Sequence, residues 1–292
     1  DADAGLCGAV VSFSSSATDN CSSVSIVYSE PNGSLLPVGT TVVTITATDL
    51  CGNASTEDFN VTVVDNENPT ALCQNISIQL DATGNASISP TDIDGGSIDN
   101  CGIASLALDN TDFDCSEVGD NTLTLTITDD NNNVSTCNSI VTVEDNLAPD
   151  AICAPQFSLD LDAFGFASIV TADINNGSTD NCGVADLEID ILTFDCSNIS
   201  ENLVTLTVTD VNRNVDVCST IVLVEDNNTP EALCQNITIQ LDASGSASIL
   251  AADIDAGSLD GCGSVSLSID ISNFDCSNVG TNTVILTVTD DN

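Results

Sequence analysis

The sequence predicts an all-β protein, built as a tandem array of immunoglobulin-like antiparallel β-sandwich modules that are stapled by disulfide bonds. Three observations predict this class. Cysteines recur in a fixed frame of about 80 residues, apolar and polar residues alternate, and no window has the periodicity of an amphipathic helix. The chain has 14 cysteines and no histidine, which is typical of disulfides rather than of zinc or redox sites. We therefore expect it to work outside the cytoplasm.

The repeat is clearest in its cysteines. Cys73 returns as Cys153 and Cys234, at intervals of 80 and 81 residues, and the surrounding sequence ALCQNISIQLDATGNASI returns as ALCQNITIQLDASGSASI. Near-identical modules in series usually provide reach, stiffness or multivalent contact. We expect a partial module over residues 1–66 that lacks its first strand, modules over 67–147 and 148–228, and a module over 229–292 that lacks its last strand.

Short, half-buried strands are expected in every module. Apolar residues alternate with polar ones over residues 76–80, 123–127 and 141–143, and residues 105–108 supply a middle strand. Thr, Val and Ile dominate these runs, while Asn, Asp and Gly fill the gaps. About seven short strands in such a module favour an immunoglobulin-like sandwich. Aromatic residues make up only 3% of the chain, so cores this small need covalent help.

The disulfide pairing is inferred from this topology. In such a sandwich the first and last strands commonly run parallel, which pairs Cys73 with Cys137 and, by the repeat, Cys153 with Cys218. The remaining cysteines stand in couples 14 residues apart. That spacing predicts four local bonds: Cys7–Cys21, Cys101–Cys115, Cys182–Cys196 and Cys262–Cys276. Cys51 and Cys234 would then pair outside the segment, the alternative being two free thiols.

The charge excludes several classes of function. There are 45 acidic residues against one basic residue, Arg213, and the formal net charge is -44. Phosphate binding needs Lys and Arg, so we expect no nucleic-acid partner and no binding to an anionic membrane surface. We also expect no insertion into a membrane in this segment. Without His or Lys for acid–base or Schiff-base chemistry, we expect no enzyme and no catalytic residues. The acidic surface either keeps the chain soluble in a salty medium or binds divalent cations.

Acidic residues gather where modules meet. The linkers Asp65–Pro69, Glu144–Pro149 and Glu225–Pro230 each end in proline, and they resemble the Asp-Asn-x-x-Pro linkers that calcium rigidifies in cadherin arrays. Calcium takes six to eight oxygen ligands, so we predict Ca²⁺ at these junctions. The alternative is that Asp and Asn only make turns. The candidate ligands are Asp65, Asn66, Asp99, Asp129, Asn131, Glu144, Asp145, Asn146, Asp180, Asp210, Asn212, Glu225, Asp226, Asn227, Asp260 and Asp290.

The first module resembles a hyalin-repeat (HYR) module in its stretches Ala17–Cys21, Leu36–Thr41 and Thr48–Asn53. It departs from that pattern at Glu57, where a cysteine is usual, and this puts the partner of Cys51 in doubt. The later modules resemble repeats of giant Bacteroidetes surface adhesins, including those of gliding motility, in their Cys-Gln-Asn-Ile, Asp-Asn-Cys-Gly and Val-Glu-Asp-Asn stretches. This resemblance implies export through the outer membrane by the type IX system.

Two functions are compatible with these expectations. The first is a structural stalk within a long secreted cell-surface adhesin, stiffened by disulfides and calcium, whose partners are neighbouring repeats of the same chain. The alternative is a segment that self-associates into an extracellular fibre or surface layer. Strand faces rich in Thr, Ser and Asn favour the stalk.

Overall fold

A computed structural model describes residues 1–290, which are almost entirely β-structure. The chain divides into two compact units, unit 1 (Asp1–Asp145) and unit 2 (Asn146–Asn292). We describe unit 1 as segments one (residues 1–66) and two (67–145), and unit 2 as segments three (146–228) and four (229–290). The immunoglobulin-like all-β class predicted from the sequence is confirmed.

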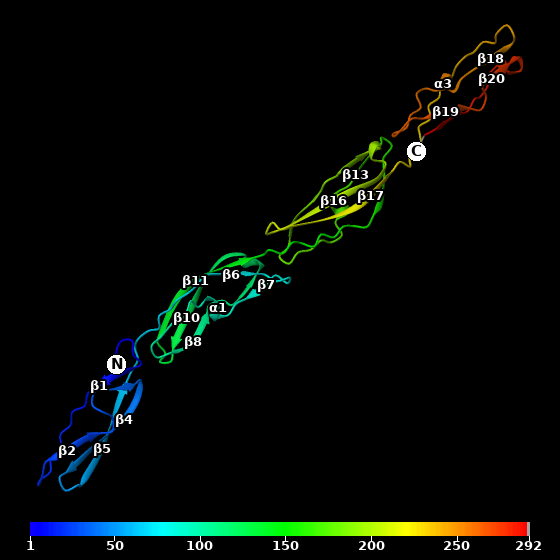
Figure 1. The fold of residues 1–292 in the computed structure, drawn as a ribbon. Coiled ribbons are helices and arrows are strands. Elements are labelled where there is room, and N and C mark those ends of the chain that lie inside the picture. The colour runs from blue at the N-terminus through cyan, green and yellow to red at the C-terminus, as the bar shows by residue number, and fades with distance from the viewer. Residues whose placement is uncertain (291–292) are drawn as a thin grey trace. The chain divides into compact units, whose positions relative to one another are not determined.

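Segment one has two small sheets (Figure 1). Strands β1 (Gly8–Val11) and β3 (Ser34–Pro37) form one antiparallel pair, and β4 (Gly39–Asp49) lies between β2 (Val24–Tyr28) and β5 (Ala54–Val63) in the other. Leu36 and Val43 are fully buried in the core of this segment. The ring of Phe13 stands edge-on to that of Phe59, with centroids 5.6 Å apart.

Segments two and three have the same arrangement of strands, which is described here for segment two. Its four-stranded sheet has the order β6-β11-β10-β8, and a second sheet pairs β7 with β9. Strand β6 runs parallel to β11, with Ile76 opposite Val141, so the predicted parallel pairing of first and last strands is confirmed. Residues 67–145 form six strands, against the seven or so expected: β6 (Ile76–Gln79), β7 (Asn85–Ser87), β8 (Ile103–Leu108), β9 (Asp112–Asp114), β10 (Gly119–Asp129) and β11 (Val134–Glu144).

Alternation along the long strands creates the buried face. Leu123, Leu125 and Ile127 of β10 are buried, whereas the threonines between them are partly exposed. Because side chains on a strand point alternately to opposite faces, this alternation fixes the face that packs on the second sheet. The apolar pattern predicted from the sequence is confirmed here.

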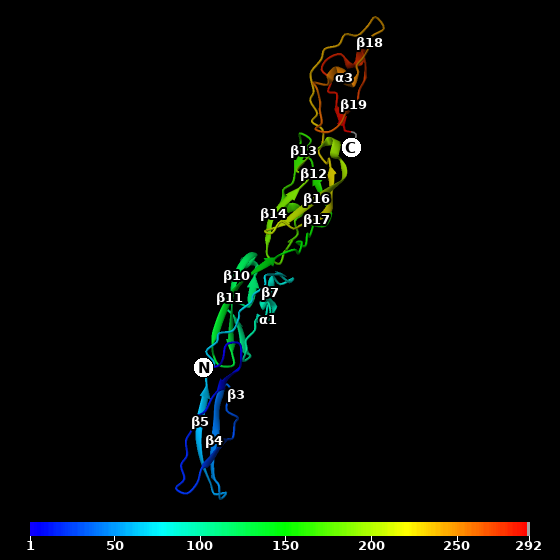
Figure 2. The ribbon, with the colours of Figure 1, turned by 60° about the vertical axis from the view of Figure 1, so that its left-hand side comes forward.

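Segment three shows how the two layers meet. Phe194, from the two-stranded sheet, packs in one core cluster with Val204 and Leu206 from the four-stranded sheet. Figure 2 shows β12, β14, β16 and β17 of this segment from a second direction. Its strands are β12 (Phe157–Asp160), β13 (Phe166–Ser168), β14 (Val184–Ile189), β15 (Thr193–Asp195), β16 (Ser200–Asp210) and β17 (Val215–Glu225).

Three very short α-helices depart from the sequence prediction. Each spans four residues, as α1 (Pro90–Ile93), α2 (Thr171–Ile174) and α3 (Ala251–Ile254), and each buries one isoleucine. The Asp92 carboxylate accepts a hydrogen bond of 2.7 Å from the backbone N–H of Ser89 and so caps α1. A single turn is too short to produce helical periodicity, which explains why no window of the sequence indicated a helix. The 3-10 turns are η1 (Cys115–Glu117), η2 (Cys196–Asn198) and η3 (Cys276–Asn278).

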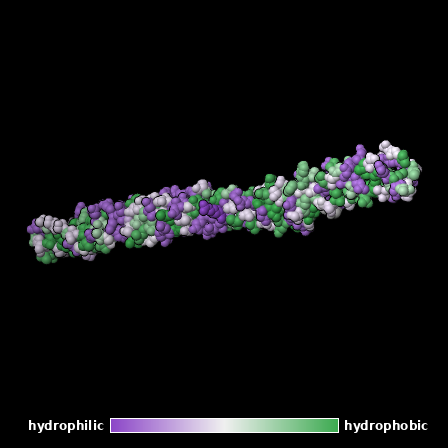
Figure 3. Space-filling view, turned by 90° about the horizontal axis from the view of Figure 1, so that it is seen from above, coloured by the Kyte–Doolittle hydropathy of each residue, from purple (hydrophilic) through white to green (hydrophobic). Residues whose placement is uncertain are grey.

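Segment four keeps only part of the pattern. Its strands are β18 (Ser246–Ser248), β19 (Ser266–Ile269), β20 (Asn273–Asp275) and β21 (Leu286–Thr289). Residues 236–241, which correspond to β6 and its flanks, form no strand although all of them are described. On the face seen in Figure 3, hydrophilic and hydrophobic residues are interspersed throughout.

Two leucines of β16 provide a matched test of this core. Leu206 is fully buried and Leu203 is 62% exposed. We expect Leu206→Ala to lower the free energy of unfolding of unit 2 by about 2–5 kcal/mol, because it leaves a cavity. Leu203→Ala should change it by no more than about 0.5 kcal/mol. Denaturant unfolding of both variants measures the difference, and equal losses would contradict the assigned face.

Candidate functional site

Two disulfides close individual segments. Cys73 bonds to Cys137 and Cys153 bonds to Cys218, with Cα separations of 5.8 and 5.7 Å. Cys73 lies just before the first strand of its sheet and Cys137 lies in the last, β11, which runs parallel to it. Both predicted bonds are therefore confirmed.

Two further disulfides join neighbouring segments, which the sequence did not predict. Cys7 of segment one bonds to Cys101 of segment two, and Cys196 of segment three bonds to Cys262 of segment four. The predicted local pairs Cys7–Cys21, Cys101–Cys115, Cys182–Cys196 and Cys262–Cys276 are therefore wrong. Cys115 and Cys182 are also disulfide-bonded.

Strand length explains why the local pairs fail. Strand β8 occupies residues 103–108, between Cys101 and Cys115. Six extended residues span about 20 Å, whereas the Cα atoms of a disulfide lie within about 7 Å. After β8 the chain does not fold back on this strand but enters β9, which pairs with β7 in the other sheet. Cys115 is therefore not returned to Cys101, and a spacing of 14 residues closes a local loop only when the chain turns back on itself.

Four cysteines are free and exposed within the described residues: Cys21, Cys51, Cys234 and Cys276. For Cys51 and Cys234, a partner outside the segment stays a prediction. Cys21 and Cys276 become free because their predicted partners bond across a junction instead.

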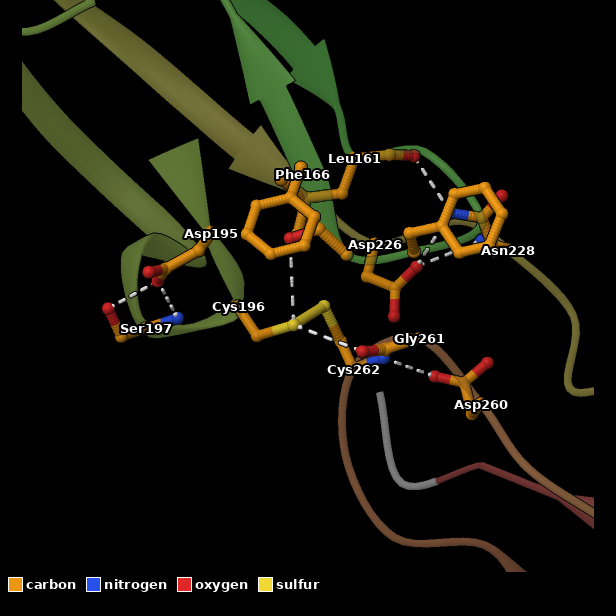
Figure 4. Close-up of a disulfide and its surroundings, with 12 residues drawn as sticks. Leu161, Phe166, Asp195, Cys196, Ser197, Asp226, Asn228, Asp260, Gly261 and Cys262 are labelled. Carbon is orange, nitrogen blue, oxygen red and sulfur yellow. Dashed lines mark hydrogen bonds between the residues drawn. A yellow bond between two sulfur atoms is a disulfide. The ribbon is translucent and has the colours of Figure 1, made fainter. Parts of the chain in front are cut away.

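The junction between segments three and four is tightly packed (Figure 4). Cys262 is 1% exposed and belongs to the core cluster of segment three. A Cβ added to Gly261 would lie 2.8 Å from the carbonyl oxygen of Ala163, and one added to Gly165 would lie 2.8 Å from the carbonyl oxygen of Gly261. Gly165 also has φ +79. The two backbones thus approach as closely as glycine permits.

Hydrogen bonds accompany this disulfide. The Asp260 carboxylate accepts a bond of 2.8 Å from the backbone N–H of Cys262. Asn228 lies in the linker, and its side-chain amide donates to the carbonyl of Leu161 at 2.8 Å. Both ends of the junction are therefore held by polar contacts as well as by the covalent bond.

The junction in unit 1 gathers the predicted acidic residues. One ligand atom each from Asp65, Asp99 and Cys101 lies within 4.8 Å of the others. The Cys101 sulfur is bonded to Cys7, so it cannot act as a thiolate, and the two carboxylates remain. The amide of Asn133 donates to the backbone carbonyl of Asp65 at 3.2 Å. The linker is thereby tied to the turn after β10.

Asp129 organises that turn. It is 1% exposed, and its carboxylate accepts from the backbone N–H groups of Asn131 and Asn133 at 2.8 and 2.7 Å and from the Asn133 amide at 2.8 Å. Burial raises the pKa of Asp129 because it disfavours the charged carboxylate, and the hydrogen bonds from Asn133 and Asn131 lower it. The hydrogen bonds have the larger combined effect, so the pKa of Asp129 lies below its ordinary value. Asp210 is equally buried and accepts the equivalent bonds from Asn212 and Asn214.

Several buried oxygens at these turns lack a donor. Asp65 is 3% exposed, and its Oδ2 has no hydrogen-bond partner among the described residues. Three further side-chain oxygens are buried and accept no hydrogen bond from the described residues: Asn100 Oδ1 in unit 1, and Asp180 Oδ1 and Asn212 Oδ1 in unit 2. A buried unpaired carboxylate oxygen is costly. A cation would compensate that cost.

The other predicted ligands differ in burial, and several already take part in hydrogen bonds. The Asn66 amide donates to the Asp1 carboxylate at 2.8 Å and the Asn227 amide donates to the Asp160 carboxylate at 2.8 Å. Asp226 accepts from the backbone N–H of Asn228 at 3.1 Å. Asp145 is buried, Asn146 is exposed, and four residues are partly exposed: Asn131, Glu144, Glu225 and Asp290. The sequence did not single out Gly261, whose role depends on a contact across a junction.

Comparisons with known proteins agree in part with these expectations. Residues 2–63 match the HYR domain family. The chain is similar to protocadherin gamma B7 extracellular cadherin domains 1–4 at 12% identity, covering 92% of this chain and 84% of that one, with a TM-score of 0.34. It is also similar to Drosophila N-cadherin EC1–4, at 11% identity over 71% and 67% of the two chains, with a TM-score of 0.32. No curated protein sequence matches it.

The HYR match over residues 2–63 and the disulfide bonds agree with an extracellular repeat. None of the helices within residues 1–290 has the length and hydropathy needed to cross a membrane.

The junction disulfides can be checked by non-reducing peptide mapping. We expect linked peptides for Cys7–Cys101 and Cys196–Cys262. Gly261→Ala should reduce the yield of Cys196–Cys262, because its Cβ meets the Ala163 carbonyl at 2.8 Å. Asn100 is the equivalent residue at the unit 1 junction, and it already carries a Cβ. Asn100→Ala should therefore leave the Cys7–Cys101 bond intact. Recovery of Cys262 linked to Cys276 would contradict the arrangement.

Asp129 should make stability depend on pH. Its folded pKa is depressed, so its contribution is complete above the unfolded pKa of about 3.9 and is lost as the pH falls through the lower, folded value. Asp129→Asn should therefore cost about 1.5–3 kcal/mol at pH 7 and progressively less below about pH 4. Unfolding in chelator at both pH values measures this. The exposed neighbour variant Asp130→Asn is the control, and an Asp129→Asn loss that stays constant with pH would refute the assignment.

Proposed function

We propose that the chain is a structural stalk segment of a long secreted cell-surface adhesin, and that its four segments are tandem modules of that stalk. The observation that carries the proposal is the pair of disulfides between neighbouring segments, Cys7–Cys101 and Cys196–Cys262. A module that only had to be stable would need bonds within itself. Bonds to the next module restrain the angle between them, which is what a stalk requires.

The linkers support the same function. In unit 1 the chain passes from β5, which ends at Val63, to the bridge at Thr70 through a short acidic stretch that contains Pro69. Such a linker is too short to behave as a flexible coil. Together with the Cys7–Cys101 bond it gives two covalent connections between segments one and two. Two separated connections oppose both twisting and bending.

We further propose that calcium binds at the junctions. In unit 1 the residues that would hold it are Asp65, Asp99 and Asn100, with Asp129 shaping the adjacent turn. Their oxygens are the hard ligands that calcium prefers, and Asp65 Oδ2 and Asn100 Oδ1 are buried without a donor. When bound, the ion supplies positive charge that offsets the repulsion between these carboxylates. Asp65 ends segment one and Asp99 belongs to segment two, so their shared ion would hold the junction closed.

The cellular setting of the stalk is proposed from the family resemblance. The HYR-like and adhesin-like stretches support a bacterial surface protein of the Bacteroidetes type, exported through the outer membrane by the type IX system. An extracellular location agrees with the disulfides, which persist in oxidising compartments.

Calcium titration tests the metal part of the proposal. At a free concentration one hundred times Kd, calcium should stabilise unit 1 by about 2.7 kcal/mol per site. Asp65→Asn and Asp99→Asn should each weaken calcium binding about tenfold or more, which corresponds to about 1.4 kcal/mol. Asp58 is exposed on β5, and Asp58→Asn removes the same single negative charge. It should have no effect on calcium binding. Calorimetry measures the affinity, and the absence of any calcium heat would leave these residues as turn formers.

Small-angle scattering tests the stalk itself. We expect an extended particle in calcium that becomes more flexible in chelator and most flexible when Cys7→Ser and Cys196→Ser also remove the junction bonds. A compact particle under all conditions would exclude a stalk.

A further inference from the structure

Segment one carries two thiols that none of the bonds described above uses. Its cysteines are Cys7, Cys21 and Cys51. Cys7 is bonded to Cys101 of segment two, whereas Cys21 and Cys51 are free and exposed. Segments two and three are each closed by an internal disulfide. With Cys7 engaged, the one internal disulfide that segment one can form joins Cys21 to Cys51.

The two cysteines lie on adjacent stretches of backbone. Strand β2 pairs antiparallel with β4, and Cys21 comes shortly before β2 while Cys51 comes shortly after β4. Beyond the ends of these strands, the backbone N–H of Leu50 donates to the Ser22 hydroxyl at 3.4 Å. Cys21 precedes Ser22 and Cys51 follows Leu50, so each cysteine is one residue, about 3.8 Å of chain, from this contact. The Cα atoms of a disulfide lie within about 7 Å of each other, a separation that such a contact makes attainable.

Two aspartates hold the backbone around these cysteines. The Asp19 carboxylate accepts a hydrogen bond of 2.8 Å from the backbone N–H of Cys21. The Asp49 carboxylate accepts from the backbone N–H groups of Cys51 and Asn53 at 2.8 and 2.9 Å. Each cysteine thus follows by two residues an aspartate that fixes its backbone. These bonds do not involve sulfur, so a disulfide can form without breaking them.

The turn after β4 differs from its counterparts at the position of Cys51. It has the sequence Thr-Asp-Leu-Cys-Gly-Asn, whereas the turns after β10 and β16 have the sequences Thr-Asp-Asp-Asn-Asn-Asn and Thr-Asp-Val-Asn-Arg-Asn. Cys51 therefore replaces an asparagine, the counterpart of Asn131 and Asn212. In segments two and three the cysteine of the Asp-Asn-Cys loop, such as Cys101, is disulfide-bonded, and its counterpart in segment one, Cys21, is free. Of these three segments, the one with a free loop cysteine is the one whose turn provides a second thiol.

We propose that Cys21 and Cys51 form a disulfide that closes segment one at the end opposite its linker (Figure 1). The bond ties the loop of residues 12–23, which forms no strand, to the turn between β4 and β5. It gives Cys51 a partner inside the chain, in place of the outside partner predicted from the sequence. Segment one thereby gains the kind of covalent closure that segments two and three already have.

The covalent step needs a two-electron oxidant, and a small-molecule disulfide such as oxidised glutathione supplies it. The Cys21 thiolate attacks one sulfur of that disulfide, whose S–S bond breaks, and the electron pair leaves with one small thiolate. The Cys51 thiolate then attacks the Cys21 sulfur, and the second small thiolate leaves. The two released thiolates take up the protons given up by Cys21 and Cys51. Two protein thiols are thereby oxidised to one disulfide, and the small disulfide is reduced to two thiols.

Oxidation of the intact chain tests the bond. Oxidised glutathione is added in chelator while the existing disulfides stay intact, and non-reducing peptide mapping follows Cys21 and Cys51. We expect the two to be recovered linked to each other. In the matched variant Cys51→Ser, Cys21 should stop at the mixed disulfide with glutathione. In denaturant, the ratio of linked pair to mixed disulfide in the unchanged chain should fall at least about tenfold, because the contact between loop and turn is lost and the effective concentration of the pair drops.

Amide hydrogen exchange measures what the bond does. On oxidation, exchange should slow in residues 12–23 and 50–53 and stay unchanged in β16 and β17 of unit 2. The Cys51→Ser chain, treated in the same way, should show no slowing. Recovery of both cysteines only as mixed disulfides, linkage of either one to a second copy of the chain, or equal exchange in the two chains would each overturn the proposal. None of these outcomes depends on calcium or on the stalk, so the proposals can fail separately.

Discussion

The disulfide between neighbouring segments is the constraint on which the rest of the arrangement depends. Cys7–Cys101 fixes the start of segment one against the loop that carries Asp99 and Asn100. That contact brings Asp65 of the linker within reach of Asp99. Without the bond, two carboxylates of like charge would separate, because nothing basic stands near enough in the sequence to hold them. The covalent link thus enforces an electrostatic arrangement that would not form by itself.

The acidic surface and the small cores leave each segment with few ion pairs and few aromatic contacts. Each segment buries aliphatic residues and few aromatic ones, such as Phe194 in segment three and Phe13 in segment one, and the chain has one basic residue to pair with its acids. Local hydrogen bonds replace ion pairs. The serine two residues after each of Asp114, Asp195 and Asp275 donates to that carboxylate from both its hydroxyl and its backbone N–H, and these bonds lower the three pKa values. The carboxylates therefore stay charged and still cap the 3-10 turns, each of which begins with a cysteine.

The difference between segments two and four shows how far a strand depends on its neighbour. Residues 237–240 have nearly the sequence of β6, yet they are not a strand without a partner on their edge. Strand propensity describes how well side chains fit a pleated surface, and it cannot replace the hydrogen bonds of a ladder. The period-two pattern over residues 123–127 predicted β10 correctly, and that strand has neighbours on each side.

The sequence by itself determined the class of fold, the alternation along the long strands, the parallel first and last strands and the two disulfides that close a segment. These features depend on local periodicity and on a repeat that is visible in the amino-acid sequence. Only the tertiary structure decided that Cys7 and Cys196 reach the next segment, that Asn100 and Asp65 bury unpaired oxygens, and that Gly261 lies against Ala163. The physical reason is that all three are contacts between segments. Spacing along the chain describes what is near in sequence, whereas a strand carries the ends of a 14-residue stretch apart and delivers each of them to a different neighbour.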